Sequence, residues 1–172
     1  LSPELLDLER ELIRETPRIM SINQELSQED RAAILRCVKV MGPGMLLYQQ
    51  RQSRQGLSNL QDMEDYCYYV AGVVGEMLTE VYGNHVPEIQ IHREQLLPLA
   101  RSFGQGLQMT NILKDVWDDL QRGVCWLPAE VFSDLGYSLD RLSAGESDLA
   151  YEEGINSLIA LAHFRLKEAL FY

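Results

Sequence analysis

Helical spacing of apolar residues is the feature that most constrains how this chain folds. Apolar side chains recur every three or four residues in the long segments, and polar and apolar residues nowhere alternate for long enough to indicate a strand. The sequence contains neither an internal repeat nor a low-complexity segment. Its 172 residues fit a single domain over residues 1–172. The sequence therefore predicts an all-α fold.

Capping residues, prolines and glycines divide the chain into expected helices. A first helix begins at Ser2-Pro3 and is interrupted at Thr16-Pro17. A second begins at the capping sequence of residues 27–30, and Gly42-Pro43-Gly44 should kink or break it. Residues 51–56 are polar and predict a loop. Three later helices are each expected to end at a glycine: residues 59–82 before Gly83, residues 92–121 before Gly123, and residues 128–135 before Gly136. A short turn is expected after Ser138, and a last helix over residues 147–172.

Charge and cysteine content argue against several classes of function. The net charge of −11 argues against non-specific binding of nucleic acid, which requires clustered cations. The longest apolar runs are shorter than the roughly 20 residues of a membrane span, and the sequence opens with no signal peptide. Cys37, Cys67 and Cys125 are odd in number and lack CxxC spacing. We therefore expect a reduced, cytoplasmic protein without a structural zinc site.

A polar stripe runs along residues 108–119. Its members fall within roughly 80° of one another on a helical wheel, and they are Gln108, Asn111, Asp115 and Asp119. Two carboxylates four residues apart repel each other, and an amide carbonyl one turn earlier adds a third oxygen. Such a set suits Mg²⁺ or Mn²⁺, hard cations that also keep water and phosphate oxygens as ligands. The spacing leaves a solvated acidic face open as the alternative.

A second informative segment, residues 65–75, carries two glycines within four positions of an expected helix. Glycine in a helix costs about 1 kcal/mol relative to alanine, so Gly72 and Gly75 require a reason. One reason is close packing of another helix, and the other is room for a long ligand beside the backbone. In the second case an apolar wall would follow Tyr66 by about one turn, formed by Ala71, Val74, Gly75 and Leu78.

Together the two segments resemble signatures of the squalene/phytoene synthase family of prenyl transferases. The first reads Tyr66-Cys67-x-Tyr69-Val70-Ala71-Gly72-x-Val74-Gly75, and the second, similar to the family's second aspartate-rich motif, reads Gln108-x-Thr110-Asn111-Ile112-Leu113-x-Asp115-x-x-x-Asp119. They stand in the family's order, about 40 residues apart. Tyr69 and the run Met41-Gly42-x-Gly44-Met45 look more like squalene synthases. The resemblance implies an isoprenoid-synthase-type helical bundle around a central cavity, incomplete at its N-terminal side.

For function, the resemblance implies Mg²⁺-dependent, head-to-head condensation of two farnesyl-type diphosphates to presqualene diphosphate and squalene. Asn111, Asp115 and Asp119 would hold Mg²⁺, or Mn²⁺, on the departing diphosphate, and the apolar wall would keep water from the allylic cation. Tyr66 would line the reaction centre as a catalytic residue beside the two aspartates. Gln108 would lie at the mouth of the site.

The resemblance implies further substrate and cofactor contacts. Lys114 and Arg122 are candidate cations for the diphosphate, although charge compensation at a helix end is the alternative for both. NADPH would be required if squalene is the final product. Peripheral membrane contact during product release is also implied. The sequence makes no prediction of oligomeric state.

Some positions depart from the family pattern. The earlier aspartate-rich motif is missing, because Asp62 and Asp65 stand in the wrong place, so we expect it in sequence before Leu1. Lys114 replaces the usual arginine, and Val124 stands where many members have arginine. A phytoene or dehydrosqualene synthase, another isoprenoid synthase, or an inactive helical scaffold therefore remain alternatives. Because the last expected helix has no stop signal, we expect the chain to be part of a longer protein.

Overall fold

The computed structural model describes residues 3–143, 145 and 148–171, and within these ranges it consists of helices and connections without a strand. The all-α prediction is confirmed. The predicted starts at Ser2 and Ser147 and the predicted end at Tyr172 lie outside the described residues. The elements are α1 (Pro3–Glu25), α2 (Gln28–Gln50), α3 (Leu60–Cys67), the π-helical turn η1 (Tyr68–Gly72), α4 (Val73–His85), α5 (Pro87–Ile91), α6 (Arg93–Lys114), α7 (Val116–Gln121), α8 (Ala129–Ser133), the 3₁₀ turn η2 (Leu139–Arg141), α9 (Leu149–Glu168) and the 3₁₀ turn η3 (Ala169–Phe171).

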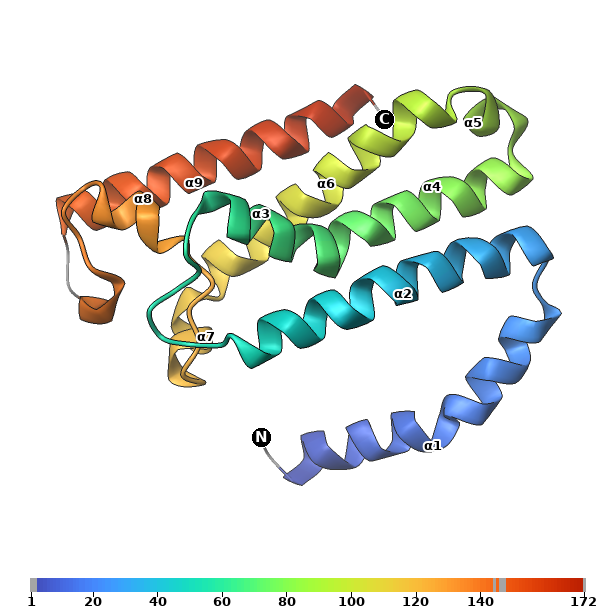
Figure 1. The fold of residues 1–172 in the computed structure, drawn as a ribbon, viewed down its shortest axis with the longest axis horizontal. Coiled ribbons are helices and arrows are strands. Elements are labelled where there is room, and N and C mark those ends of the chain that lie inside the picture. The colour runs from blue at the N-terminus through green and yellow to red at the C-terminus, as the bar shows by residue number, and fades with distance from the viewer. Residues whose placement is uncertain (1–2, 144, 146–147, 172) are drawn as a thin grey trace.

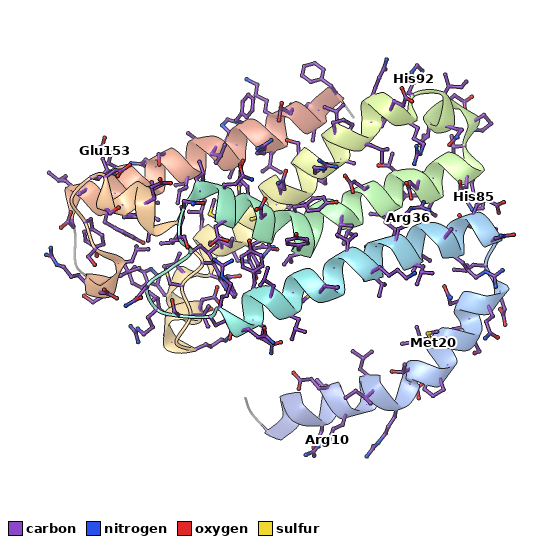
Figure 2. The ribbon with its side chains drawn as sticks, in the orientation of Figure 1. Arg10, Met20, Arg36, His85, His92 and Glu153 are labelled. Atoms are coloured by element: carbon purple, nitrogen blue, oxygen red, sulfur yellow. The ribbon has the colours of Figure 1, made fainter. Side chains whose placement is uncertain are left out.

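Four long helices pack side by side in the order α2, α4, α6 and α9 (Figure 1). The segment α3–η1–α4 forms one long rod that crosses α6. Helix α1 lies apart from this layer, and its apolar side chains, Met20 among them, are exposed (Figure 2). Among the described residues, no helix is both long enough and apolar enough to cross a membrane.

The hydrophobic core lies at one end of the layer, where α3, the second half of α6, α7, α8 and α9 meet. Its fully buried side chains include Met63, Met109, Leu127, Phe132 and Leu158. This core holds the segment that carries the polar stripe against the segment that carries Tyr66. The two sequence signatures therefore share one packed end of the molecule.

Glycines permit the close crossing of α6 over the η1–α4 rod. A Cβ atom added at Gly75 would collide with the backbone carbonyl oxygen of Ala100, and one at Gly104 would collide with that of Ala71. Only glycine leaves room for this approach of two backbones. The structure thus provides the first of the two reasons considered for glycine in this helix, which is helix packing.

Several helix starts and ends agree with their predicted caps. The Ser27 hydroxyl accepts a hydrogen bond from the backbone N–H of Asp30, and the Asn59 side chain accepts one from that of Asp62. Gly123 and Gly136 follow α7 and α8 with φ of +83° and +80°, the conformation that favours glycine.

Neither proline ends its helix, so the predicted interruption at Pro17 and the predicted break at Gly42-Pro43-Gly44 are wrong, whereas a kink in α2 stays a prediction. Helix α1 runs through Pro17, and α2 runs through Gly42-Pro43-Gly44 as one helix of 23 residues. Pro43 is exposed, while buried residues of α2 on both sides of it, Cys37 and Gly44 among them, pack against the rest of the layer and hold the helix together. A single lost backbone hydrogen bond is insufficient to end a helix that is packed along its length.

Three predicted boundaries near α4 and α6 also differ. Gly83 lies inside α4 and is buried against α5, a short helix that the sequence analysis did not predict. Helix α4 ends at His85 because Val86 adopts the extended conformation required before Pro87. The predicted helix over residues 92–121 divides at Asp115 into α6 and α7.

Candidate functional site

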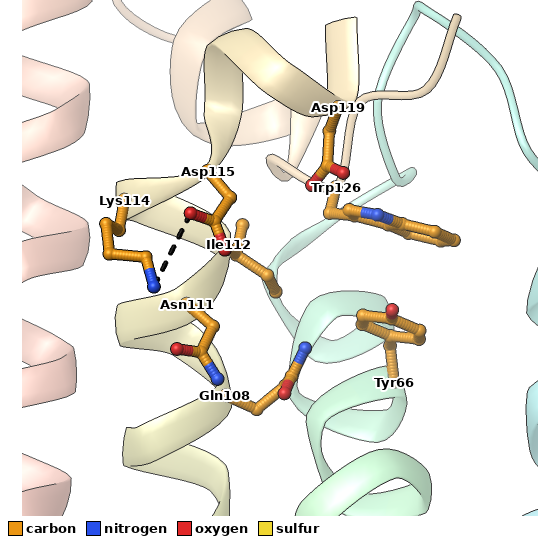
Figure 3. A pocket seen from close by; sticks show the side chains of 8 residues that line it. All are labelled: Tyr66, Gln108, Asn111, Ile112, Lys114, Asp115, Asp119 and Trp126. Atoms are coloured by element: carbon orange, nitrogen blue, oxygen red, sulfur yellow. Dashed lines mark ion pairs between the residues drawn. The ribbon is translucent and has the colours of Figure 1, made fainter. Parts of the chain in front are cut away.

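A pocket of about 450 Å³ lies between α3 and the junction of α6 with α7 (Figure 3). The fold brings the two signature segments together here, although they are far apart in the sequence. Six of the eight lining residues are predicted site residues, and their catalytic and binding roles stay predictions. The lining consists of Tyr66, Gln108, Asn111, Ile112, Lys114, Asp115, Asp119 and Trp126.

The polar stripe survives the division between α6 and α7. The Asp115 N–H donates to the Asn111 carbonyl at 2.9 Å, and the Asp119 N–H donates to the Asp115 carbonyl at 2.9 Å. These are bonds between residues four apart, so the helical register continues across the junction. As a result Asn111, Asp115 and Asp119 face the same pocket from successive turns.

The two carboxylates have different environments. The Asp119 side chain is 19% exposed, whereas that of Asp115 is 42% exposed. Burial is the main cause that raises the pKa of Asp119, and the charges of Asp115 and Asp118 add to it while Arg122 opposes it. The site therefore holds excess negative charge that a bound cation would neutralise.

Two basic residues already contact these carboxylates. The Lys114 ammonium lies 3.5 Å from an Asp115 oxygen, and the Arg122 guanidinium lies 3.5 Å from an Asp119 oxygen. Both basic side chains are largely exposed, so these ion pairs contribute little to stability. Lys114 lines the pocket, whereas Arg122, at the end of α7, does not.

The donor atoms fit a hard divalent cation that takes further ligands from elsewhere. Asn111, Asp115 and Asp119 offer only oxygen, the ligand type that Mg²⁺ prefers. Within the described part of the chain, no group of three or more His, Cys, Asp or Glu side chains is placed to hold a metal. Two carboxylates and one amide therefore form a partial ligand set, which suits an ion shared with water and phosphate oxygens.

The earlier aspartates, Asp62 and Asp65, do not take part in this set. Both Asp62 carboxylate oxygens accept hydrogen bonds from Arg51, at 2.9 and 2.7 Å, and one of them also accepts a bond from the Tyr48 hydroxyl at 2.9 Å. Asp65 pairs with Gln61 on the exposed side of α3. Asp62 therefore holds the loop before α3.

Two aromatic rings, those of Tyr66 and Trp126, form an aromatic wall of the pocket, beside Asp119 and across from Asp115 (Figure 3). The Tyr66 ring stacks on the Trp126 indole, with centroids 4.3 Å apart and planes 7° apart, and it meets the Tyr48 ring at 5.2 Å. Burial is the main cause that raises the pKa of Tyr66 to about 12. The phenol is therefore neutral at physiological pH.

The predicted apolar wall does not line this pocket. Ala71 and Gly75 face the α6 backbone, Val74 is half-buried and Leu78 is 41% exposed. The π-helical turn η1 widens the helix directly after Tyr66, and this rotates the residues that follow it relative to an uninterrupted α-helix. That these four residues contact a substrate stays a prediction.

Two lining residues were missed by the sequence analysis. Trp126 comes from the loop after α7, about 60 residues beyond Tyr66, and Ile112 lies between members of the polar stripe. No spacing rule connects Trp126 with Tyr66, because the contact depends on how two loops meet. The π-helical turn was also missed, since glycine and aromatic residues do not specify it.

The chain is similar in sequence to proteins of one known family. The model of the family described as squalene/phytoene synthase matches residues 3–172. The chain is 31% identical to the squalene synthase of Saccharomyces cerevisiae over 168 residues, which is 94% of this chain and 37% of that protein. It is 36% identical to the phytoene synthase of Pseudescherichia vulneris over 102 residues, which is 59% of this chain and 31% of that protein.

A solved structure shares the fold. The ligand complex of TcSQS superposes with a TM-score of 0.72 at 23% sequence identity, over 93% of this chain and 46% of that one. At this identity the likeness concerns the fold alone. The chain spans about a third of the length of the curated relatives that it matches, between 28% and 38%.

Proposed function

The chain belongs to the squalene/phytoene synthase family, and we propose that it supplies one side of the active site of a head-to-head prenyl transferase. The observation that carries the proposal is the pocket itself. It joins Tyr66 from one family signature to Asn111, Asp115 and Asp119 from the other, with Asp115 across the pocket from the phenol and Asp119 beside the Trp126 indole. The proposed substrate is a prenyl diphosphate of the farnesyl type.

The polar wall is suited to hold a diphosphate through Mg²⁺ bound to Asn111, Asp115 and Asp119. The ion would supply charge neutralisation to the departing diphosphate. Lys114 already lies at the pocket and is available to contact diphosphate oxygens when its pairing with Asp115 is exchanged. The partial burial of Asp119 supports this role, because a carboxylate removed from water interacts more strongly with a neighbouring positive charge.

The aromatic wall is suited to a cationic reaction. Tyr66, Trp126 and Ile112 exclude water from one side of the pocket, which protects an allylic cation from capture. The neutral Tyr66 phenol offers a hydroxyl that can orient toward the reacting carbons or move a proton. The Gln108 amide lines the pocket from α6, and we expect it to contact substrate.

Turnover of farnesyl diphosphate by the full-length protein, with and without Mg²⁺, tests the proposal. Asp115→Asn keeps the shape of the side chain and removes its charge, and we expect a loss of kcat of about 100-fold or more. Asp118→Asn is the matched control, because Asp118 neighbours the site on α7 but lies outside the pocket. Equal activity of wild type and Asp115→Asn would refute the metal assignment.

A readout without turnover comes from thermal stability. We expect Mg²⁺ with inorganic pyrophosphate to raise the melting temperature of the wild-type protein, and to raise that of the Asp115→Asn variant less. No stabilisation together with no turnover would favour an inactive helical scaffold. The identity of the product requires a separate experiment. Chromatography of the products formed with and without NADPH identifies it, because squalene formation ends in a reduction.

A phytoene or dehydrosqualene synthase is the second candidate. The 36% identity to the phytoene synthase of Pseudescherichia vulneris supports it, although over a smaller share of the chain than the match to the yeast squalene synthase. A product that forms at the same rate without NADPH and retains a central double bond would identify this candidate.

A further inference from the structure

One face of the Tyr66 phenol is covered by the Trp126 indole. The two rings are nearly parallel, 7° apart, with centroids 4.3 Å apart, and both line the pocket. The Tyr48 ring meets Tyr66 at 59° and 5.2 Å. Aromatic neighbours therefore cover two sides of the phenol ring. The edge of the ring that carries the hydroxyl faces the pocket (Figure 3).

Packing rather than hydrogen bonding holds the phenol in this position. In the described part of the chain the Tyr66 hydroxyl has no hydrogen-bond partner, whereas the Tyr48 hydroxyl donates to Asp62 at 2.9 Å. A tyrosine without a hydrogen bond turns about its side-chain bonds unless its neighbours prevent it. Tyr48 and Trp126 are those neighbours.

The backbone at Trp126 is itself fixed to the loop that precedes α3. The Cys125 N–H donates to the Ser53 carbonyl at 2.8 Å, and the Leu57 N–H donates to the Leu127 carbonyl at 2.9 Å. Gly56 lies in this contact with φ of +86°, where a Cβ would collide with the Leu127 carbonyl oxygen. Residues on both sides of Trp126 are thus bound to the chain that leads into Tyr66.

We propose that Trp126 is a positioning residue for Tyr66: its stacked indole, held by the two paired loops, directs the Tyr66 hydroxyl at the reacting carbons. The inference rests on the proposed prenyl transfer. A positioning role differs from a purely structural role, because Trp126 then affects the reaction only through the Tyr66 hydroxyl. Removing that hydroxyl should therefore remove the effect.

The test is a double-mutant cycle on kcat in the full-length protein. Trp126→Leu should lower kcat by about 10-fold or more with KM within about 3-fold, and Trp126→Phe, which still stacks, should retain most of the activity. In a Tyr66→Phe background, Trp126→Leu should cost less than about 3-fold further, because the two residues act as a unit. Trp117→Leu is the matched control, because Trp117 is an exposed residue of α7 that lies outside the pocket.

A second measurement separates this inference from the proposed function. With 3-fluorotyrosine incorporated, ¹⁹F NMR reports the Tyr66 ring, whose signal is identified by its loss in Tyr66→Phe. A restrained ring gives distinct environments for the fluorine, which should average in Trp126→Leu and persist in Trp117→Leu. Equal losses of kcat in both backgrounds, or an unchanged Tyr66 signal in Trp126→Leu, would overturn the inference. A wild type without turnover would instead overturn the proposed function, and the NMR result would still decide whether Trp126 restrains the ring.

Discussion

Asp30 ties the beginning of α2 to the end of α4. One of its carboxylate oxygens accepts a hydrogen bond from the Asn84 amide at 2.8 Å, and the other lies 2.8 Å from the His85 ring, at the end of α4 (Figure 2). Hydrogen bonds from Asn84, Ser27 and His85 lower the pKa of Asp30 to about 2. An ionised Asp30 therefore stabilises the folded state.

This lowered pKa predicts an acid-side loss of stability. An aspartate in an unfolded chain has a pKa of about 3.9, so the contribution of Asp30 is complete above that pH and is lost as pH falls toward 2. We expect Asp30→Asn to be less stable than wild type at pH 7 and the two proteins to converge at pH 2. Urea unfolding at several pH values measures this, and parallel pH curves for the two proteins would contradict it.

Residue types in the sequence identify six of the eight residues that line the pocket and miss Ile112 and Trp126. Asp115, Asp119 and Tyr66 are recognisable because carboxylates at helical spacing and a tyrosine before paired glycines are unusual patterns. Trp126 is not recognisable, because a single tryptophan near a proline occurs in many loops. Its importance arises from its contact with Tyr66, which only the folded chain brings about.

At the scale of elements, the crossing of α6 over the η1–α4 rod depends on glycine. Gly75→Ala places a methyl group against the Ala100 carbonyl, and we expect a loss of about 1–3 kcal/mol from the free energy of unfolding. Gly42→Ala is the control, because its added methyl meets no atom within 4 Å. We expect its effect to stay within about 1 kcal/mol, since Pro43 limits the gain that alanine otherwise brings to a helix. Equal losses in both variants, measured by urea unfolding, would contradict the packing explanation.

Because α2 continues through Pro43, we expect this proline to lower the free energy of unfolding, and we expect the tertiary contacts of α2 to offset the loss. Pro43→Ala restores a backbone donor and removes the clash with the preceding turn, so we expect the protein to gain about 1–3 kcal/mol of stability. Pro17→Ala in α1 is the comparison, because α1 lies apart from the packed layer. There we expect more helical circular dichroism without a change in the cooperative unfolding transition. A loss of stability in Pro43→Ala would show that the proline has a structural role.

Element boundaries were predictable where a local signal decides them. Ser27, Asn59, Gly123 and Gly136 act through their own side chain or φ angle, so their sequence neighbourhood is sufficient. Gly83 failed as a helix end because it is buried against α5, a contact that local sequence does not contain. The division at Asp115 likewise depends on how α7 turns into the core.

At the scale of the whole molecule, helices α1 and α2 leave several large apolar side chains exposed. Those on α1 and α2 include Leu12, Ile13, Ile19, Leu35 and Val38, all at least half exposed. Apolar surface of this extent favours association, while the net charge of −11 opposes it by repulsion. The balance between these two effects therefore depends on salt.

We expect the isolated chain to self-associate, and to do so more strongly at high ionic strength, where the repulsion is screened. The double variant Ile13→Lys/Val38→Lys should weaken association, whereas Leu149→Lys, an exposed position on α9, should not. Sedimentation velocity at low and high salt measures both. A chain that remains monomeric at high salt would show that these faces do not drive association.

The sequence by itself determined the all-α class, most helix caps and the polar stripe of Asn111, Asp115 and Asp119, because each depends on interactions within a few turns of one helix. Only the tertiary structure decided that Tyr66 faces this stripe across a pocket, that Trp126 covers the phenol, and that the glycines serve a helix crossing. These features join residues that are many positions apart. Such contacts form only when helices pack, and the packing energy that selects them is shared among the side chains of the whole core.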